Sequence, residues 1–245
     1  TFALAVLAFA RWLQRPAMGR ALLFTLAAAL CLLTKFSALL FLPVACLAML
    51  PPALAARRDL PALRSLRLWP VTLKTLGLLG LFLLTLWAGY GFSVGRLVSD
   101  PDSPLLHVVS DALFLPFEDM RSLLSREVYP LSELVKGVVE VASHNTEGHR
   151  AYLLGRVSDT GWWYYYPVAL ALKLPLVVSG LWVLGAGWLV MGWRRHGIHV
   201  PALAVLTVPL AVLLAAMLVS NINIGVRHIL AVLPFVAVAC GHALQ

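Results

Sequence analysis

Long apolar runs, separated by short polar or basic segments, make up most of this chain. A helix needs roughly 20 residues to cross a hydrocarbon core, and by that measure 73–92, 175–193 and 199–219 are predicted membrane spans. Two further apolar runs, 1–10 and 229–245, predict truncated spans. None of the runs alternates with a period of two, so helices rather than a transmembrane barrel are expected to satisfy the backbone hydrogen bonds. The pattern therefore predicts an all-α integral membrane protein with a polytopic helical bundle.

The run 21–50 does not fit a single span, because its 30 residues are too many for one crossing. Arg11, Arg15 and Arg20 precede it, and five basic residues follow it: Arg57, Arg58, Arg64, Arg67 and Lys74. Under the positive-inside rule both flanks are cytoplasmic. We therefore predict that 21–50 crosses twice, or enters and returns, with a turn near Thr34–Ser37.

This hairpin fixes the rest of the predicted topology. The span 73–92 leads outward, a long loop at 93–162 lies outside, and 175–193 returns to the basic pair Arg194 and Arg195. The span 199–219 then leads outward again, to an outer turn at 221–228. The chain divides into a bundle part (1–92), an extracytoplasmic loop (93–162) and a second bundle part (163–245). It begins within one apolar run and ends after another, so we expect a fragment of a longer protein.

The outer loop is predicted to be helical rather than a linker. Between Leu131 and Ala142 the apolar residues follow the helical spacing of one face, at positions 131, 134, 135, 138, 139 and 142. Proline-containing breakers at 100–104 and 115–117 divide the loop into two or three short helices joined by turns.

Composition supports the membrane assignment and isolates three cations. Hydrophobic residues make up 61% of the chain and charged residues only 12%, which excludes an ordinary soluble globular protein. The three cysteines, Cys31, Cys46 and Cys240, lie in apolar runs without metal-ligand spacing and are expected to be buried as small hydrophobic residues. Outside the basic cytoplasmic segments and the acidic outer loop, the remaining cations are Lys35, Lys173 and Arg227.

Lys35, Lys173 and Arg227 are all assigned to the outer half of the bundle. An ionisable residue at membrane depth is a functional-site hypothesis by default. Two interpretations remain open: the cations extend to the interface and pair with loop carboxylates, or together they bind a phosphate or pyrophosphate carried on a membrane lipid. His228, next to Arg227, belongs to the same candidate site.

Five aromatic residues, 162–166, precede Lys173. They fit either an interfacial aromatic belt or a groove for a sugar or an isoprenoid, for which Trp163 and Tyr165 are the candidates. His144 and His149 flank Glu147 and are candidates for polar contacts to a substrate. A solvated loop fits them equally well, and a metal site lacks a third strong ligand.

Three segments together resemble a known family: LLTKFSALLFLP, AYLLGRVSDTGWWYYYPVALALKLPL and SNINIGVRHILAVLPF. In order and spacing they resemble the bacterial members of glycosyltransferase family 39. This family belongs to the GT-C superfamily, which includes the dolichyl-phosphate-mannose protein mannosyltransferases and the aminoarabinose transferase acting on lipid A. The likeness covers most of 20–245 in layout. It departs from the family at Ala231, where a proline is expected.

The resemblance implies transfer of a sugar, with inversion, from a polyprenyl-phosphate donor to a protein, lipid or glycan acceptor. The reaction is expected at the outer face of the bacterial inner membrane, in a multi-pass enzyme. Lys35, Lys173, Arg227 and His228 would contact the donor phosphate, and the catalytic acidic residues would lie upstream of Thr1. The resemblance also implies that no nucleotide sugar enters the active site. The sequence itself predicts no cofactor, does not support a divalent cation and predicts no nucleic-acid partner. The alternatives are a polymerase or ligase of lipid-linked glycans, and a transporter or flippase of a lipid phosphate.

Overall fold

The structure is a computed structural model. It describes residues 1–55, 68–97, 125–196, 200–219, 221, 223 and 225–244. The basic cluster at 57–67 and the two loop breakers predicted at 100–104 and 115–117 lie outside the described residues.

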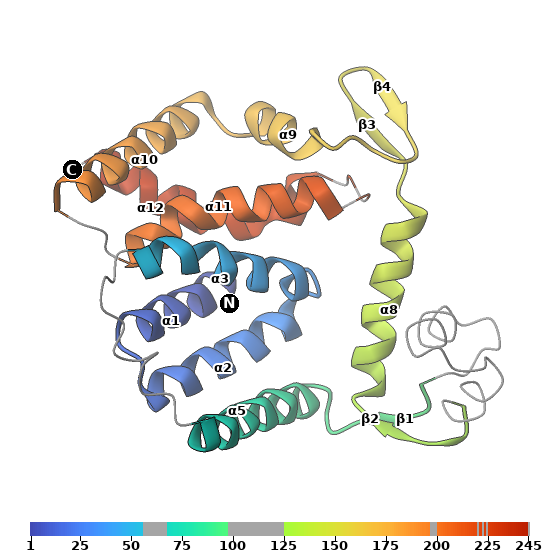
Figure 1. Ribbon diagram of the computed structural model, residues 1–245. Coiled ribbons are helices and arrows are strands. Elements are labelled where there is room, and N and C mark those ends of the chain that lie inside the picture. Colours follow the sequence, from blue (N-terminus) through green and yellow to red (C-terminus); the bar gives the residue numbers. More distant parts are fainter. Residues whose placement is uncertain are drawn as a thin grey trace.

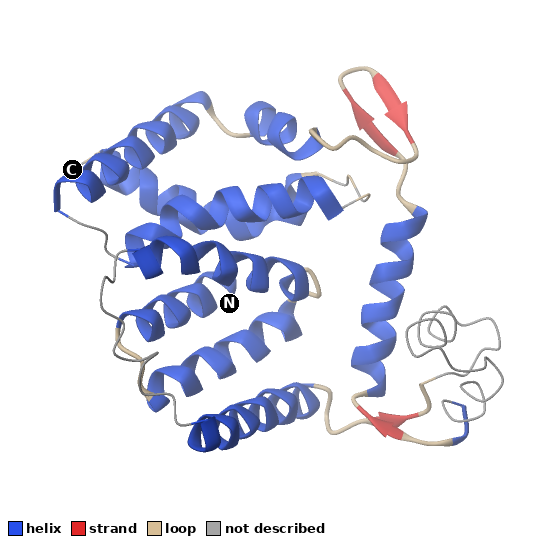
Figure 2. Cartoon of the chain, in the orientation of Figure 1, coloured by secondary structure: helices blue, strands red, loops and turns tan. Residues whose placement is uncertain are grey.

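The described chain is mainly helical (Figures 1 and 2). Its α-helices are α1 (Phe2–Gln14), α2 (Met18–Thr34), α3 (Ala38–Ala55), α5 (Leu68–Gly89), α8 (Ser132–Glu147), α9 (Tyr165–Lys173), α10 (Leu176–His196), α11 (Val200–Val219) and α12 (Leu233–Ala243). A 3-10 helix, η1 (Val226–Val232), leads into α12. Two small antiparallel ribbons pair β1 (Val94–Gly95) with β2 (Tyr129–Pro130) and β3 (Ala151–Leu153) with β4 (Arg156–Ser158).

Three helical stretches of the described chain are long and apolar enough to cross a membrane: Thr72–Gly89, Ala202–Val219 and Val226–Ala243. The helices α9 and α10 make a fourth if they are taken as one broken span, bent by 114°. Two of these stretches correspond to the predicted spans 73–92 and 199–219; Val226–Ala243 corresponds to the run predicted as a truncated span, and the predicted span 175–193 qualifies only together with α9. The three stretches are compatible with an all-α membrane protein. The helices α1, α2 and α3 are apolar but shorter, so crossing by them stays a prediction.

The long helices lie side by side, and α8 runs across one end of the group (Figure 1). The closest helix pairs are α11 with α3, α10 with α12, α1 with α2 and α2 with α5. Small residues permit close approach, as at Gly185 of α10, where a β-carbon would meet the backbone of Ala239 in α12. Lipid tails are as apolar as the helix surfaces, so in a membrane the hydrophobic effect does not drive helices together. Close packing of this kind holds them together instead.

The turn predicted within 21–50 is confirmed. The helix α2 ends at Thr34 and α3 begins at Ala38. Lys35 closes α2 with an extended backbone (φ −163°, ψ 126°), and its N–H donates to the carbonyl of Cys31. The first N–H of α3, on Ala38, donates to the carbonyl of Lys35. Lys35 is thereby held at the tip of the hairpin rather than in the middle of a long helix.

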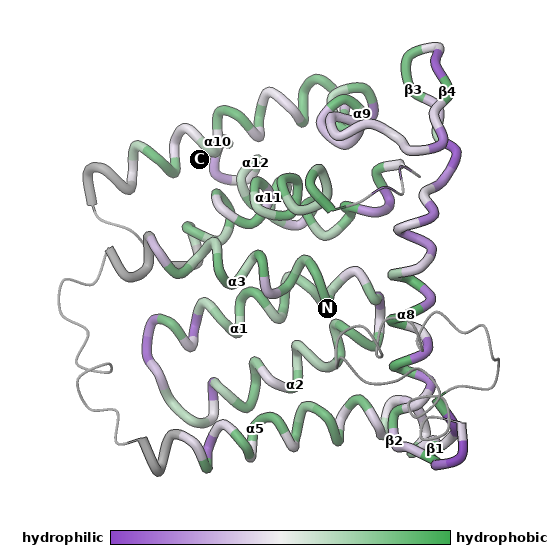
Figure 3. The backbone as a smooth tube through the Cα atoms, turned by 45° about the vertical axis from the view of Figure 1, so that its right-hand side comes forward, coloured by the Kyte–Doolittle hydropathy of each residue, from purple (hydrophilic) through white to green (hydrophobic). Residues whose placement is uncertain are grey.

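The helix predicted at 131–142 is also confirmed, and it continues to Glu147. It is more hydrophilic than the helices of the bundle (Figure 3). The prediction of helices and turns alone in 93–162 was incomplete, because β1, β2, β3 and β4 lie there. Strands of two or three residues are too short to produce a recognisable period-two pattern.

Candidate functional site

The connector is defined here as the described residues Asn221, Asn223 and Gly225 together with the first residues of η1, Val226 to His228; it follows α11 at the end of the bundle crossed by α8. Asn221 donates its backbone N–H to Oδ1 of Asn145 in α8 at 3.1 Å. Asn145 in turn donates from Nδ2 to the carbonyl of Val219 at 2.9 Å. One amide side chain therefore ties the last turns of α8 to the end of α11.

Asn223 ties the connector to the segment that precedes α9. Its side chain is buried, and Nδ2 donates to the carbonyl of Trp162 at 3.3 Å. Gly161 adopts a φ of +71°, and a β-carbon there would overlap the amide of Asn223. Glycine is required at 161 for both its backbone conformation and its lack of a side chain.

Lys35 reaches the connector from the tip of the α2–α3 hairpin. Its Nζ donates to the backbone carbonyl of Arg227 at 2.9 Å. Burial lowers the pKa of Lys35 below its usual value, and the positive charge of Arg227 lowers that pKa further. Within the described part of the chain, no carboxylate forms an ion pair with Lys35 or with Arg227. Two cations are thus held together without a neutralising group among those residues.

The cation that interrupts the apolar run after the aromatic residues is Lys173, and its position in the fold accounts for it. It is the last residue of α9, where a positive charge is favoured by the helix dipole, and α10 then starts in a direction 114° away. Its Nζ lies 3.6 Å from the position that a β-carbon would take on Gly225. The third cation therefore also comes to the connector.

His228 is held between two aromatic rings. It stacks on Tyr166, with centroids 5.9 Å apart and ring planes 24° apart. The edge of Phe41 contacts it from α3, with centroids 5.9 Å apart at 81°. The sequence analysis missed Tyr166, whose side chain is 1% exposed. The signal was its position seven residues before Lys173, which places both residues on one face of a helix.

Two cavities meet at Lys35 and His228. The larger, called here the Lys35 pocket, has a volume of about 670 Å³, and its apolar wall includes Phe36, Leu40 and Val138. The smaller has a volume of about 360 Å³ and lies on the side of Thr34. Both are also lined by Ser37 and Phe41. Lys35 and His228 therefore lie between the mainly apolar Lys35 pocket and the smaller cavity beside Thr34.

Of the eight substrate-binding candidates, the structure brings together Lys35, Lys173, Arg227 and His228 around the connector. The other four lie elsewhere. Trp163 is 69% exposed and contacts Tyr164, and Tyr165 is buried in the helical core.

His144 and His149 are exposed, with ring centroids 5.8 Å apart. His144 belongs to α8 and not to a loop. No group of three potential metal ligands occurs within the described chain. Cys31 is buried, and Cys46 and Cys240 are half-buried; all three are free thiols.

The connector site combines clustered positive charge with an apolar wall, a combination suited to an anion attached to a hydrocarbon chain. The three positive charges come from different elements. Lys35 is held by its hydrogen bond to the carbonyl of Arg227, and Lys173 is positioned by the end of α9. Comparison of the chain with protein-family models, with curated proteins and with solved structures finds no match. The chemistry of the connector site is therefore the basis on which a function can be argued.

Proposed function

We propose that this chain is the donor-binding part of a membrane glycosyltransferase of the GT-C type, similar to bacterial family 39, which takes a sugar from a polyprenyl phosphate. One observation carries the proposal. Lys35, Lys173 and Arg227, which are far apart in the sequence, converge on the connector beside an apolar pocket. A lipid that carries one phosphate or two has the matching chemistry, with an anionic head and an apolar chain.

In the proposed reaction an acceptor atom forms a bond to the anomeric carbon of the sugar while the bond from that carbon to the donor phosphate oxygen breaks. The electron pair of the broken bond stays on the lipid phosphate, so negative charge develops there. Lys35, Lys173 and Arg227 would neutralise that charge, the role of preorganised cations in transition-state stabilisation. The acceptor's proton would pass to an acidic residue expected upstream of Thr1. The acceptor, a protein, a lipid or a glycan, would bind at the outer face of a bacterial inner membrane.

The test is transfer of a radiolabelled sugar from a polyprenyl phosphate by the full-length gene product in membrane vesicles. Lys35→Met keeps the length of the side chain and removes its charge, and Arg227→Gln keeps the backbone carbonyl that Lys35 contacts. We expect each change to lower the rate by roughly 100-fold or more, the usual effect of losing one charge-stabilising group. The matched control is Lys136→Met, since Lys136 lies on the nearby helix α8 and pairs with the exposed Glu133 at 3.1 Å.

Two results would overturn the proposal. If the inserted Lys35 and Arg227 variants transfer sugar as fast as the wild type, the cations are interfacial anchors. If the wild type consumes no lipid-linked sugar but moves a lipid phosphate across the membrane, the protein is a transporter. A product that grows by repeated additions to a lipid-linked glycan would instead identify a polymerase.

A further inference from the structure

A second group of cations lies at the opposite end of α2, in the turn between α1 and α2. Arg20 donates from Nη1 to the carbonyls of Arg15 at 2.8 Å and Arg11 at 3.3 Å. The side chains of Arg11 and Arg15 are exposed, and that of Arg20 is half-buried. We call these three residues the arginine turn. The hydrogen bonds from Arg20 hold its positive charge against the end of α1, next to the other two arginines.

The arginine turn has no neutralising group of its own. Residues 1–58 contain no aspartate or glutamate, and no carboxylate in the described part of the chain pairs with these arginines. Arg20 also lies in the first turn of α2, where no acidic residue is present and where the helix dipole disfavours a cation. An external anion would balance the positive charge of these side chains and offset the unfavourable dipole at Arg20.

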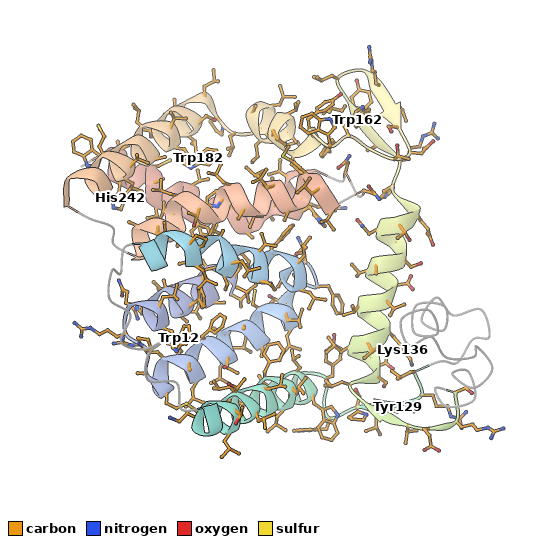
Figure 4. All side chains as sticks on the ribbon, viewed as in Figure 1. Trp12, Tyr129, Lys136, Trp162, Trp182 and His242 are labelled. Atoms are coloured by element: carbon orange, nitrogen blue, oxygen red, sulfur yellow. The ribbon has the colours of Figure 1, made fainter. Side chains whose placement is uncertain are left out.

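The surroundings of the arginine turn favour a lipid as the source of that anion. The outward face of α2 continues from the turn with exposed apolar side chains at Leu23, Leu26 and Leu30, which are 45%, 38% and 48% exposed. Trp12, at the end of α1 (Figure 4), is half-buried and stacks on Phe9 with centroids 6.0 Å apart. Tryptophan is enriched at the boundary between the hydrocarbon and the headgroups of a membrane. A charged cluster, an aromatic residue near it on α1 and an exposed apolar face of α2 thus occur together in this part of the fold.

The arginine turn is also well separated from the connector site. Arg20 and Lys35 are 15 residues apart along α2 and its cap, which corresponds to about 22 Å at the rise of an α-helix. This is shorter than a hydrocarbon core of about 30 Å, but it is far longer than a lipid headgroup. One ligand headgroup cannot serve both sites.

We infer that the arginine turn binds the phosphate of an anionic glycerophospholipid, whose acyl chains lie along the exposed leucines of α2. This inference is independent of the proposed transferase activity. Guanidinium groups suit the task because they bind phosphate oxygens in a fork and stay charged at every physiological pH. The lipid would be a resident of the leaflet opposite the connector site.

Native mass spectrometry of the full-length gene product, with added phosphatidylglycerol or phosphatidylcholine, tests the inference. The main variant is R11Q/R15Q, because neither side chain donates a hydrogen bond to a described residue, so the turn itself should survive. Each basic residue near an anionic lipid contributes about a fivefold change in affinity. We expect phosphatidylglycerol binding to weaken by about 30-fold in R11Q/R15Q. The matched control is R96Q/R156Q, which removes the same charge from exposed positions near the other end of the bundle.

Three results would overturn the inference: unchanged phosphatidylglycerol affinity in R11Q/R15Q, equal loss in R96Q/R156Q, or equal binding of phosphatidylcholine by the wild type. Binding of soluble glycerol phosphate, which has the phosphate but no acyl chains, is measured in the same way. If it binds as tightly as the lipid, the apolar face contributes nothing and the site is not a lipid site. Equal binding of the two phospholipids by the wild type overturns the inference even if a variant fails to fold, whereas a preference for phosphatidylglycerol is assigned to the arginine turn by its loss in R11Q/R15Q.

Discussion

The two ends of α2 both gather positive charge, but they do so in different ways. The arginine turn is local: its three residues lie within ten positions of one another, and one set of backbone carbonyls holds Arg20 in place. The connector site is assembled from three distant segments; its cations are exposed, and Lys35 also lines two cavities. Exposed local charge suits a mobile lipid headgroup. Charge that distant segments bring together and backbone contacts pre-position suits a reaction in which new charge must be stabilised without rearrangement.

The strongest test of this difference measures both sugar transfer and phosphatidylglycerol binding in variants of each end. R11Q/R15Q should leave the rate of sugar transfer within about twofold of the wild type, whereas Lys35→Met lowers it by roughly 100-fold. Lys35→Met should in turn leave phosphatidylglycerol binding unchanged. If either variant alters both measurements to the same degree, the two ends form one functional unit and the distinction is wrong.

A pair of glycine substitutions compares the packing at the two ends. Gly161→Ala should lower the free energy of unfolding by about 2–3 kcal/mol, because alanine must adopt a φ of +71° and its β-carbon would overlap Asn223. Gly19→Ala, in the first turn of α2, should raise it by about 0.5 kcal/mol, since open space surrounds that position and alanine favours a helix. Unfolding in detergent micelles measures both changes. Equal effects would show that the connector is no more tightly packed than the turn.

The hydrogen-bonded anchors at the two ends can be compared in the same way. Asn145 accepts from Asn221 and donates to Val219, and Asn145→Ala should cost about 1–2 kcal/mol and increase hydrogen exchange in α8. Arg20→Gln removes two hydrogen bonds that lie within one local turn and should cost less than about 1 kcal/mol. Unaltered exchange in α8 after Asn145→Ala would mean that other contacts hold this helix.

The smallest expected effect concerns the pH at which Lys35 loses its proton. Burial, and then the charge of Arg227, lower the pKa of Lys35 below its usual 10.5. Between the lowered pKa and 10.5 the unfolded chain binds more protons than the folded chain, so the free energy of unfolding should rise with pH in that interval.

Acetylation followed by mass spectrometry can locate this titration. Lys35 should become reactive at a lower pH than a free lysine side chain, and Arg227→Gln should move its midpoint upward. A midpoint that Arg227→Gln leaves in place would show that the guanidinium does not act on Lys35.

Much of the fold followed from the sequence, because apolar periodicity and length suffice to locate helices that face lipid or one another. The hairpin tip at Lys35, the helix after Leu131 and two of the three predicted spans, 73–92 and 199–219, were found in this way. The small ribbons were missed because they depend on pairing between segments and not on a pattern within one. All three cysteines were predicted to be buried; Cys31 is buried, whereas Cys46 and Cys240 are only half-buried.

For the site, the sequence by itself determined which residues carry unusual charge: a lysine or arginine inside an apolar context is visible without coordinates, because its cost in a membrane makes it rare. Only the tertiary structure decided which of these charges meet. The contact of Lys35 with the carbonyl of Arg227 joins residues 192 positions apart, and the choice of Tyr166 over Trp163 beside His228 depends on which side of α9 faces the connector. Such contacts arise from helix packing across the whole bundle, and no local spacing along the chain encodes them.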